Sequence, residues 1–220
     1  MRPPRLLASG DSAVLVVFGD EIDPALNRRV HALAAHLRAA ALPGLGEAVP
    51  GYAALLVHYD PARLDEAQVQ ARLAQALDAL AAEPAGAAPE RRFEIPVRYG
   101  GAAGPDLEFV ARHAGLTPDE VVRLHAGRDY LVYMMGFTPG FAYLGEVDAR
   151  IAVPRLETPR VRVPAGSVGL AGRQTGLYPS ESPGGWRLIG RTDAALFDLG
   201  REPPSLLAPG DRVRFVPVAD

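Results

Sequence analysis

Residues 158–192 read TPRVRVPAGSVGLAGRQTGLYPSESPGGWRLIGRT, and this stretch decides the fold of the second half of the chain. Its apolar residues fall in short β-like runs, such as RVRVPAGSVGL and WRLIG, which glycines and prolines separate. No helical spacing of apolar residues crosses the stretch. Because a series of short strands with glycine and proline turns is typical of small barrels, the sequence predicts a compact β-barrel here.

The same pattern continues on both sides of this stretch. Helical periodicity ends near Tyr130, where DYLVYMMGF begins, and DRVRFVPV lies close to the C-terminus. Residues 91–100, RRFEIPVRYG, alternate like a strand with one buried face. Two short helices are predicted between these strands, one at 105–114 and one that a capping box at Thr117 starts. We expect all of these segments to form one barrel domain, residues 92–220.

The first 80 residues show a different order of elements. A β-rich run at 13–18 precedes a helix that Asp23 caps, and a second strand at 52–59 precedes a helix with apolar residues at helical spacing from Val69 to Leu80. This order predicts a small α+β domain with its helices on one face of a sheet. The predicted fold class is therefore α+β: a small N-terminal α+β domain followed by a β-barrel.

The boundary between the two domains is predicted from composition. Residues 81–91, AAEPAGAAPER, contain only small residues, prolines and charges, which suits a linker better than a core element. The predicted organisation is a first domain at 1–82, a linker at 83–91 and the barrel domain at 92–220.

Composition excludes several classes of function. The chain has no cysteine and no lysine, so it offers no thiolate, no Schiff-base amine, no P-loop lysine and no attachment point for biotin. A net charge of −3 without a basic run argues against nucleic acid as a partner. No apolar run approaches the roughly 20 residues that span a bilayer, and the N-terminus lacks a secretory apolar region. We therefore expect a cytoplasmic protein without membrane contact.

Common catalytic signatures are missing from the sequence. The five histidines do not stand at metal-ligand spacings, so we predict surface or packing roles for them and no metal site. Ser167, in AGSVG, does not fit the G-x-S-x-G template of a nucleophile elbow. The glycines fail the G-x-G-x-x-G spacing of a dinucleotide fold. A serine triad and a Rossmann site are therefore unsupported.

Five strings in the chain resemble the PxpB/KipI family. They are GFTPGFAYLG, TPRVRVPAGSVG and QTGLYPSESPGGWRLIGRT in the barrel half, and GDEIDPALNRRV and PGYAALLVHYDP in the first domain. The resemblance covers nearly the full chain. Two positions depart from the family pattern: Arg173 stands where glycine is expected in AGGQTG, and Asp193 stands where proline usually follows GRT.

The resemblance implies a fold, an activity and partners. The barrel would be cyclophilin-like, and the chain would be the PxpB-type component of an ATP-dependent 5-oxoprolinase, which cleaves 5-oxoproline (pyroglutamate) to L-glutamate. It would be a non-autonomous component of that enzyme, with a homologue of the PxpC/KipA type and a further component of the PxpA type as partners. ATP, with or without Mg²⁺, would be bound by a chain that the resemblance does not specify.

The candidate site residues lie inside the family motifs. Opening the lactam ring requires cations for phosphate and donors for developing negative charge, so Arg160 and Arg191 are candidate anion clamps, with Arg162 two residues along the same expected strand. Glu181 is the candidate base. A solvated strand face and a plain surface glutamate are the alternatives. The candidate substrate-binding residues are Phe137, Gly140, Phe141, Tyr143, Gln174, Tyr178, Ser182 and Trp186.

The stretch GFTPGFAYLG, residues 136–145, combines aromatic rings with glycines. We expect its aromatic residues to wall the mouth of the barrel opposite Trp186, with Gly136 and Gly140 allowing a ligand or partner backbone to approach. A buried turn, and an interface with the PxpC-type partner, are the alternatives. Two other functions also stay open: a KipI-like inhibitor of a histidine kinase, and a carboxyltransferase module for urea-like or allophanate-type substrates, which would need a biotinylated partner.

Overall fold

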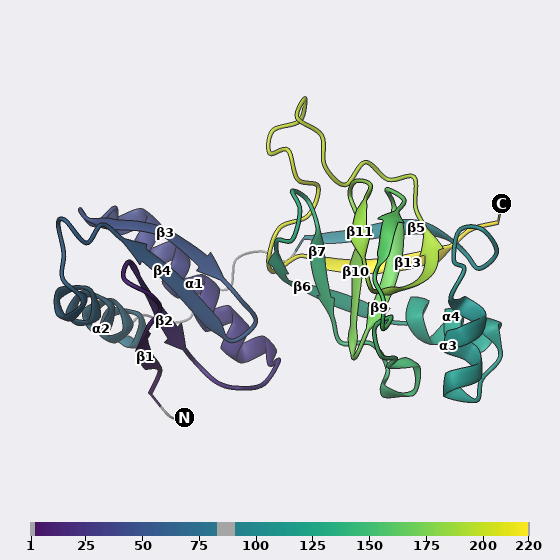
Figure 1. Ribbon diagram of the computed structural model, residues 1–220, viewed down its shortest axis with the longest axis horizontal. Coiled ribbons are helices and arrows are strands. Elements are labelled where there is room, and N and C mark those ends of the chain that lie inside the picture. Colours follow the sequence, from purple (N-terminus) through teal and green to yellow (C-terminus); the bar gives the residue numbers. More distant parts are fainter. Residues whose placement is uncertain (1–2, 83–90, 220) are drawn as a thin grey trace. The chain divides into compact units, whose positions relative to one another are not determined.

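The computed structural model of the chain describes residues 3–82 and 91–219 (Figure 1). The chain divides into two compact units, residues 1–88 and 89–220, and each unit is described by itself. The predicted linker at 83–91 lies outside the described residues except for Arg91. Among the described residues, no helix has both the length and the apolar character needed to cross a membrane.

The first unit is a four-stranded antiparallel sheet with two helices. The strand order is β1-β2-β4-β3. The elements are β1 (Arg5–Ala8), β2 (Ala13–Val17), α1 (Pro24–Ala40), β3 (Leu45–Pro50), β4 (Ala54–Tyr59) and α2 (Glu66–Ala82). The sequence predicted β2, β4 and both helices but missed the outer strands β1 and β3. These two strands pair only on one side, and most of their side chains are exposed or half-buried, so they lack a clear buried face.

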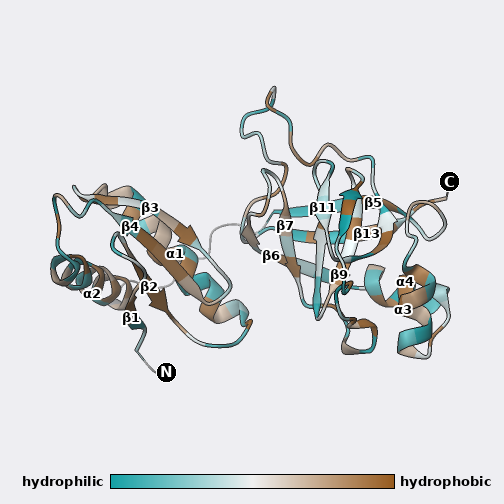
Figure 2. Ribbon diagram, in the orientation of Figure 1, coloured by the Kyte–Doolittle hydropathy of each residue, from teal (hydrophilic) through white to brown (hydrophobic). Residues whose placement is uncertain are grey.

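Local sequence explains where α1 begins and what it packs against. The Asp23 carboxylate accepts hydrogen bonds from the backbone N–H groups of Ala25 and Leu26, at 2.7 and 2.8 Å, and so caps the helix. Val30 and Leu33 on α1 pack with residues of β2, β4 and α2 in one core, which contains Val14, Val16, Leu55, Val57, Val69 and Leu73. Figure 2 shows β2 and β4 as the most hydrophobic strands of this sheet.

The second unit is a closed barrel with added helices. Its strand order is β10-β7-β6-β13-β5-β12-β9, and β11 and β8 form a separate two-stranded sheet. The elements are β5 (Arg92–Tyr99), α3 (Leu107–Ala114), α4 (Pro118–Ala126), β6 (Asp129–Met135), β7 (Ala142–Gly145), the short 3₁₀ helix η1 (Ala149–Ile151), β8 (Arg160–Val163), β9 (Ser167–Ala171), β10 (Gln174–Leu177), β11 (Ser182–Gly184), β12 (Arg187–Arg191) and β13 (Arg212–Pro217). The predicted α+β class with a β-barrel is confirmed.

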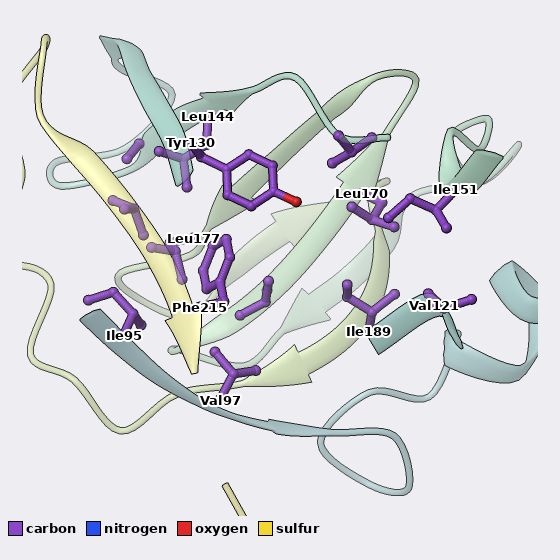
Figure 3. Packing of buried hydrophobic residues seen from close by; sticks show 14 of the residues in the cluster. Ile95, Val97, Val121, Tyr130, Leu144, Ile151, Leu170, Leu177, Ile189 and Phe215 are labelled. Carbon is purple, nitrogen blue, oxygen red and sulfur yellow. The ribbon is translucent and has the colours of Figure 1, made fainter. Parts of the chain in front are cut away.

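Apolar side chains fill the barrel interior (Figure 3). Alternate residues of each strand point inward, as the side-chain period of two requires. The labelled members of this core are Ile95, Val97, Val121, Tyr130, Leu144, Ile151, Leu170, Leu177, Ile189 and Phe215. Burial on this scale removes enough apolar surface from water to stabilise a domain of this size.

A row of hydrogen-bonded polar side chains crosses this apolar interior, with His125 of α4 at its centre. The ring is fully buried, with Nδ1 2.7 Å from the Tyr99 hydroxyl and Nε2 2.9 Å from the Thr175 hydroxyl. Because the Thr175 hydroxyl donates to the Gly169 carbonyl, it accepts from Nε2–H, and Nδ1 accepts the Tyr99 proton. Burial lowers the pKa of His125 to about 3, so the ring is neutral at pH 7. His125 thus has the packing role that the sequence predicted.

Candidate functional site

The stretch 136–145 forms a tight loop and then strand β7. Gly136 N–H donates to the Phe141 carbonyl at 3.1 Å, and Phe141 N–H donates to the Thr138 carbonyl at 3.0 Å. Phe137 adopts a φ of 68°, in the left-handed region, and remains 60% exposed. Gly140 has a φ of 83°, and a Cβ there would come within 2.7 Å of the Phe197 Cβ. The chain's own Phe197 therefore occupies the space beside Gly140 that was expected to admit a ligand or partner backbone.

Four aromatic residues, Phe141, Tyr143, Tyr178 and Trp186, pack into what we call the aromatic cluster. The Phe141 ring lies 4.8 Å from Tyr143, 5.0 Å from Tyr178 and 5.7 Å from Trp186, centroid to centroid. The last two contacts are edge-to-face, a geometry that aromatic quadrupoles favour. Phe137 adds its edge to Phe141 at 5.4 Å and to Tyr178 at 6.3 Å.

The aromatic cluster lies on the outer face of the barrel wall. Tyr143 alternates along β7 with Ala142 and Leu144, which belong to the interior core. Val163 of β8 packs on the cluster from the separate two-stranded sheet. The expected position at the barrel mouth is therefore wrong, because the strand alternation that points the aliphatic residues inward points the aromatic residues outward.

Glycines make room for the cluster on this face. Gly169 of β9 and Gly176 of β10 are paired across the sheet. A Cβ at Gly176 would lie 2.8 Å from the Trp186 ring, and a Cβ at Gly169 would lie 2.9 Å from the Trp186 Cβ. A Cβ at Gly184 of β11 would come still closer, 2.5 Å, to the Tyr178 hydroxyl. The combination of glycines and large rings in the sequence thus reflects rings lying directly on glycine backbone.

The predicted anion clamps have partners within the chain. Arg160 pairs with Asp106 at 2.9 Å, with side chains 28% and 9% exposed. Arg162 pairs with Glu181 at 2.6 Å, and both side chains are at least half exposed. Arg191 donates to the Ala165 carbonyl at 2.9 Å. The three guanidinium groups therefore have different acceptors, and the structure does not gather them into one phosphate site.

The remaining predicted residues border the aromatic cluster. Ser182 lies on β11, and its buried hydroxyl has no hydrogen-bond partner among the described residues. Gln174 is half-buried at the start of β10 and pairs across the strands with Gly145 and Ala171. Glu181, the predicted base, is adjacent to β11 and 50% exposed. The structure thus places Ser182 and Glu181 on the layer over the cluster, and their roles stay predictions.

The two departures from the family pattern both end in ion pairs. Arg173 pairs with Glu146 at 2.7 Å, so its added charge has a carboxylate partner beside Gln174. The two carboxylate oxygens of Asp193 accept hydrogen bonds from the two terminal nitrogens of the Arg98 guanidinium, at 2.7 and 2.8 Å. That hydrogen bonding holds the pKa of Asp193 below its usual value.

Sequence reasoning missed three residues at this site. Asp106 lies beneath Arg160, and its second oxygen accepts from the Leu188 N–H at 2.7 Å. Arg155 lies over the Trp186 ring, with its Cζ 5.9 Å from the centroid. Thr138 has a buried hydroxyl without a partner among the described residues. Only the contacts made by the folded chain distinguish these residues, since none stands in a periodic pattern.

Binding of ATP with Mg²⁺ requires cations placed around the phosphates and oxygen ligands for the metal. In the described ranges, no group of three or more His, Cys, Asp or Glu side chains could bind a metal ion. The candidate phosphate-binding arginines are engaged by Asp106, Glu181 and a carbonyl, as described above. As they are engaged here, these three donors do not fit a nucleotide phosphate.

Comparison with known proteins assigns the family. The family model described as "Carboxyltransferase domain, subdomain C and D" matches residues 4–207, across both units. The chain belongs to this family. Two relatives carry names that make them the B subunit of 5-oxoprolinase. The one from Bacillus subtilis is 44% identical over 96% of this chain and 91% of the relative, and the one from Escherichia coli O157:H7 is 43% identical over 99% and 97%.

Two solved structures agree with the fold. The crystal structure of TTHA0988 is 44% identical with a TM-score of 0.81, covering 94% of this chain but 40% of that one. The chain thus spans well under half of that polypeptide. The Kluyveromyces lactis urea carboxylase has a TM-score of 0.80 at 19% identity, covering 98% of this chain and 22% of the enzyme, and shows the shared fold alone.

Proposed function

We propose that the chain is the PxpB-type component of an ATP-dependent 5-oxoprolinase, which cleaves 5-oxoproline to L-glutamate with ATP hydrolysis. The observation that carries the proposal is the 43–44% identity, over nearly the whole chain, to two proteins named as the B subunit of 5-oxoprolinase. The similarity includes both units rather than the barrel alone, so it supports a common role of the whole chain in an assembly.

The chain would contribute binding and proton transfer rather than the activation of the lactam. Tyr143 is half-buried and rests on the buried rings of Phe141 and Trp186, and its apolar surface suits the methylene groups of a five-membered ring. The Ser182 and Thr138 hydroxyls, buried without a partner among the described residues, are polar atoms that an amide could satisfy. Glu181 is the proposed base for the attacking water. Arg160, through its contact with Asp106, would keep the layer over the cluster in place.

The proposed partners are a homologue of the PxpC/KipA type and a further component of the PxpA type. The names of the two relatives describe them as subunits, which supports an assembly. The longer TTHA0988 polypeptide supports it too, because more than half of that chain lies outside the part this protein covers. We propose a cytoplasmic complex in which the ATP-using step belongs to the assembly as a whole.

Substitution of Glu181 tests the proposed chemistry. In the complete assembly, Glu181→Gln should abolish ATP-dependent glutamate formation while size-exclusion chromatography still shows the intact complex, because the pair with Arg162 is exposed and adds little to stability. Glu157→Gln, at another exposed glutamate of the same unit, is the matched control and should keep full turnover. Normal turnover by Glu181→Gln would remove Glu181 from the chemistry.

A carboxyltransferase module for urea-like substrates is the second candidate. The family description favours it, and so does the 25% identity to a protein named "Putative urea carboxylase" from Emericella nidulans, over 81% of this chain and 16% of that one. Because the chain contains no lysine, biotin would have to be carried by a partner. Carboxylation of urea by this chain with a biotinylated partner, in the absence of glutamate formation, would favour this candidate.

A further inference from the structure

We propose that Arg155 binds the carboxylate of the ligand at the edge of the aromatic cluster, and so selects small cyclic amides that carry an acid group. This inference rests on the proposed function, because it assigns a specificity-determining residue to that same site. Arg155 lies between η1 and β8, outside the motifs that suggested the other arginines.

The first observation is the free side chain of Arg155. It is exposed, and its guanidinium contacts the face of Trp186 at 5.9 Å from the ring centroid. Within the described ranges, it forms no ion pair and no hydrogen bond with another residue. By contrast, Arg160, Arg162 and Arg173 are each paired with a carboxylate. Arg155 therefore has its donors available for an anion.

The second observation is the effect of the Arg155 charge on two tyrosines of the cluster. Burial raises the pKa of Tyr143 and of Tyr178, and the positive charge of Arg155 opposes that rise in both. The guanidinium is thus close enough to act on two tyrosines of the cluster as well as on Trp186. An exposed cation thus lies over one ring of the cluster and beside two of its phenolic side chains.

The third observation comes from two other segments. Ser182, on β11, and Thr138, in the loop before β7, both have buried hydroxyls without a partner among the described residues. Buried polar atoms usually form hydrogen bonds, so these two hydroxyls have unused hydrogen-bonding capacity. They border the same cluster, because Ser182 pairs across the strands with Val163, which packs on the cluster, and Phe137, next to Thr138, packs on Tyr178.

These features match the chemistry of 5-oxoproline. A guanidinium presents a planar fork that fits a carboxylate with two parallel hydrogen bonds. Aromatic faces suit the ring methylenes, and hydroxyls suit the lactam amide. The carboxylate is the group that separates 5-oxoproline from a neutral lactam such as 2-pyrrolidinone. Removal of Arg155 should therefore weaken binding of the acid and reduce discrimination against the neutral lactam.

The test uses the complete assembly with three variants of this chain. Arg155→Gln removes the charge, Arg155→Lys keeps the charge but not the fork, and Arg112→Gln is a control at an exposed arginine of α3. Steady-state kinetics with 5-oxoproline, and inhibition by 2-pyrrolidinone, are measured for each. Size-exclusion chromatography verifies that each variant assembles.

Arg155→Gln should raise KM for 5-oxoproline about 10- to 100-fold with a smaller change in kcat, as expected for one charged hydrogen-bonding partner. Arg155→Lys should recover part of the loss, inhibition by 2-pyrrolidinone should be unaffected, and Arg112→Gln should behave as the wild type. An unchanged KM in Arg155→Gln, or a fall in kcat alone without rescue by lysine, would overturn the inference. An inactive wild-type assembly would instead overturn the proposed function beneath it.

Discussion

His125 shows how one residue couples the interior of the barrel to pH. Its ring is fully buried and stacks on Phe215 at 4.5 Å, between the hydroxyls of Tyr99 and Thr175. Burial also raises the pKa of Tyr130, whose hydroxyl donates to the His125 carbonyl. The surrounding groups are therefore neutral, and nothing among these contacts stabilises a charged imidazolium.

The barrel should lose stability in mild acid because of His125. The folded pKa is about 3 and the unfolded value is 6.5, so the unfolded chain binds the proton first as pH falls. The contribution of neutral His125 to the free energy of unfolding is complete above pH 6.5 and declines as the pH falls toward 3. Between pH 7 and pH 5, this one group should lower the free energy of unfolding by about 2 kcal/mol.

Urea unfolding followed by fluorescence measures this effect, because the single tryptophan, Trp186, lies in the barrel unit. The comparison is with His125→Gln, which cannot take up the proton. Carboxylates contribute equally to both proteins and cancel in the difference. If the wild type and the variant lost the same free energy between pH 7 and pH 5, His125 would not be the titrating group.

At the scale of elements, the paired glycines of β9 and β10 determine where the aromatic cluster can lie. Gly176→Ala should destabilise the barrel by about 1–3 kcal/mol, because the new Cβ would meet Trp186 at 2.8 Å and Phe141 at 3.0 Å. Gly136→Ala is the matched control, since a Cβ there meets nothing within 4 Å. The midpoints of urea unfolding of the two variants are compared. Equal midpoints would show that the cluster shifts freely to admit a methyl group.

The pair between Asp106 and Arg160 joins α3, β8 and β12. Asp106 accepts from Arg160 and from the Leu188 N–H while almost fully buried. Asp106→Ala should cost about 2–4 kcal/mol, because it leaves two donors without an acceptor. The exposed pair of Asp193 with Arg98 provides the control, and Asp193→Ala should cost at most about 1 kcal/mol. A similar fall in thermal stability for the two variants would contradict the stabilising role of the Asp106–Arg160 pair.

At the scale of the whole molecule, the sequence allowed an α+β domain followed by a β-barrel to be predicted, but not every strand or contact. Asp23, Thr117 and the apolar spacing of both long helices marked α1, α2 and α4 correctly, because capping and periodicity are local. Arg160 contacts Asp106, 54 positions away along the chain, and Arg155 contacts Trp186, 31 positions away. No local sequence pattern indicates such pairs.

The placement of the aromatic residues shows the same limit. Their presence beside glycines was evident in the sequence, but the face of the barrel on which they lie follows from strand register, which a single sequence of short strands specifies weakly. The roles of Glu181 as base and of Gln174 as a substrate-binding residue are still predictions, because they concern a ligand and partner chains.

ATP-dependent glutamate formation from 5-oxoproline, measured with individual components omitted, is the decisive experiment for the proposed function. The protein is assayed alone, then with its PxpC-type partner, then with both the PxpC-type and the PxpA-type partners. We predict glutamate only from the full set, and its loss when this chain is left out. A verified, folded assembly that forms no glutamate, or one that forms it equally well without this chain, would contradict the account.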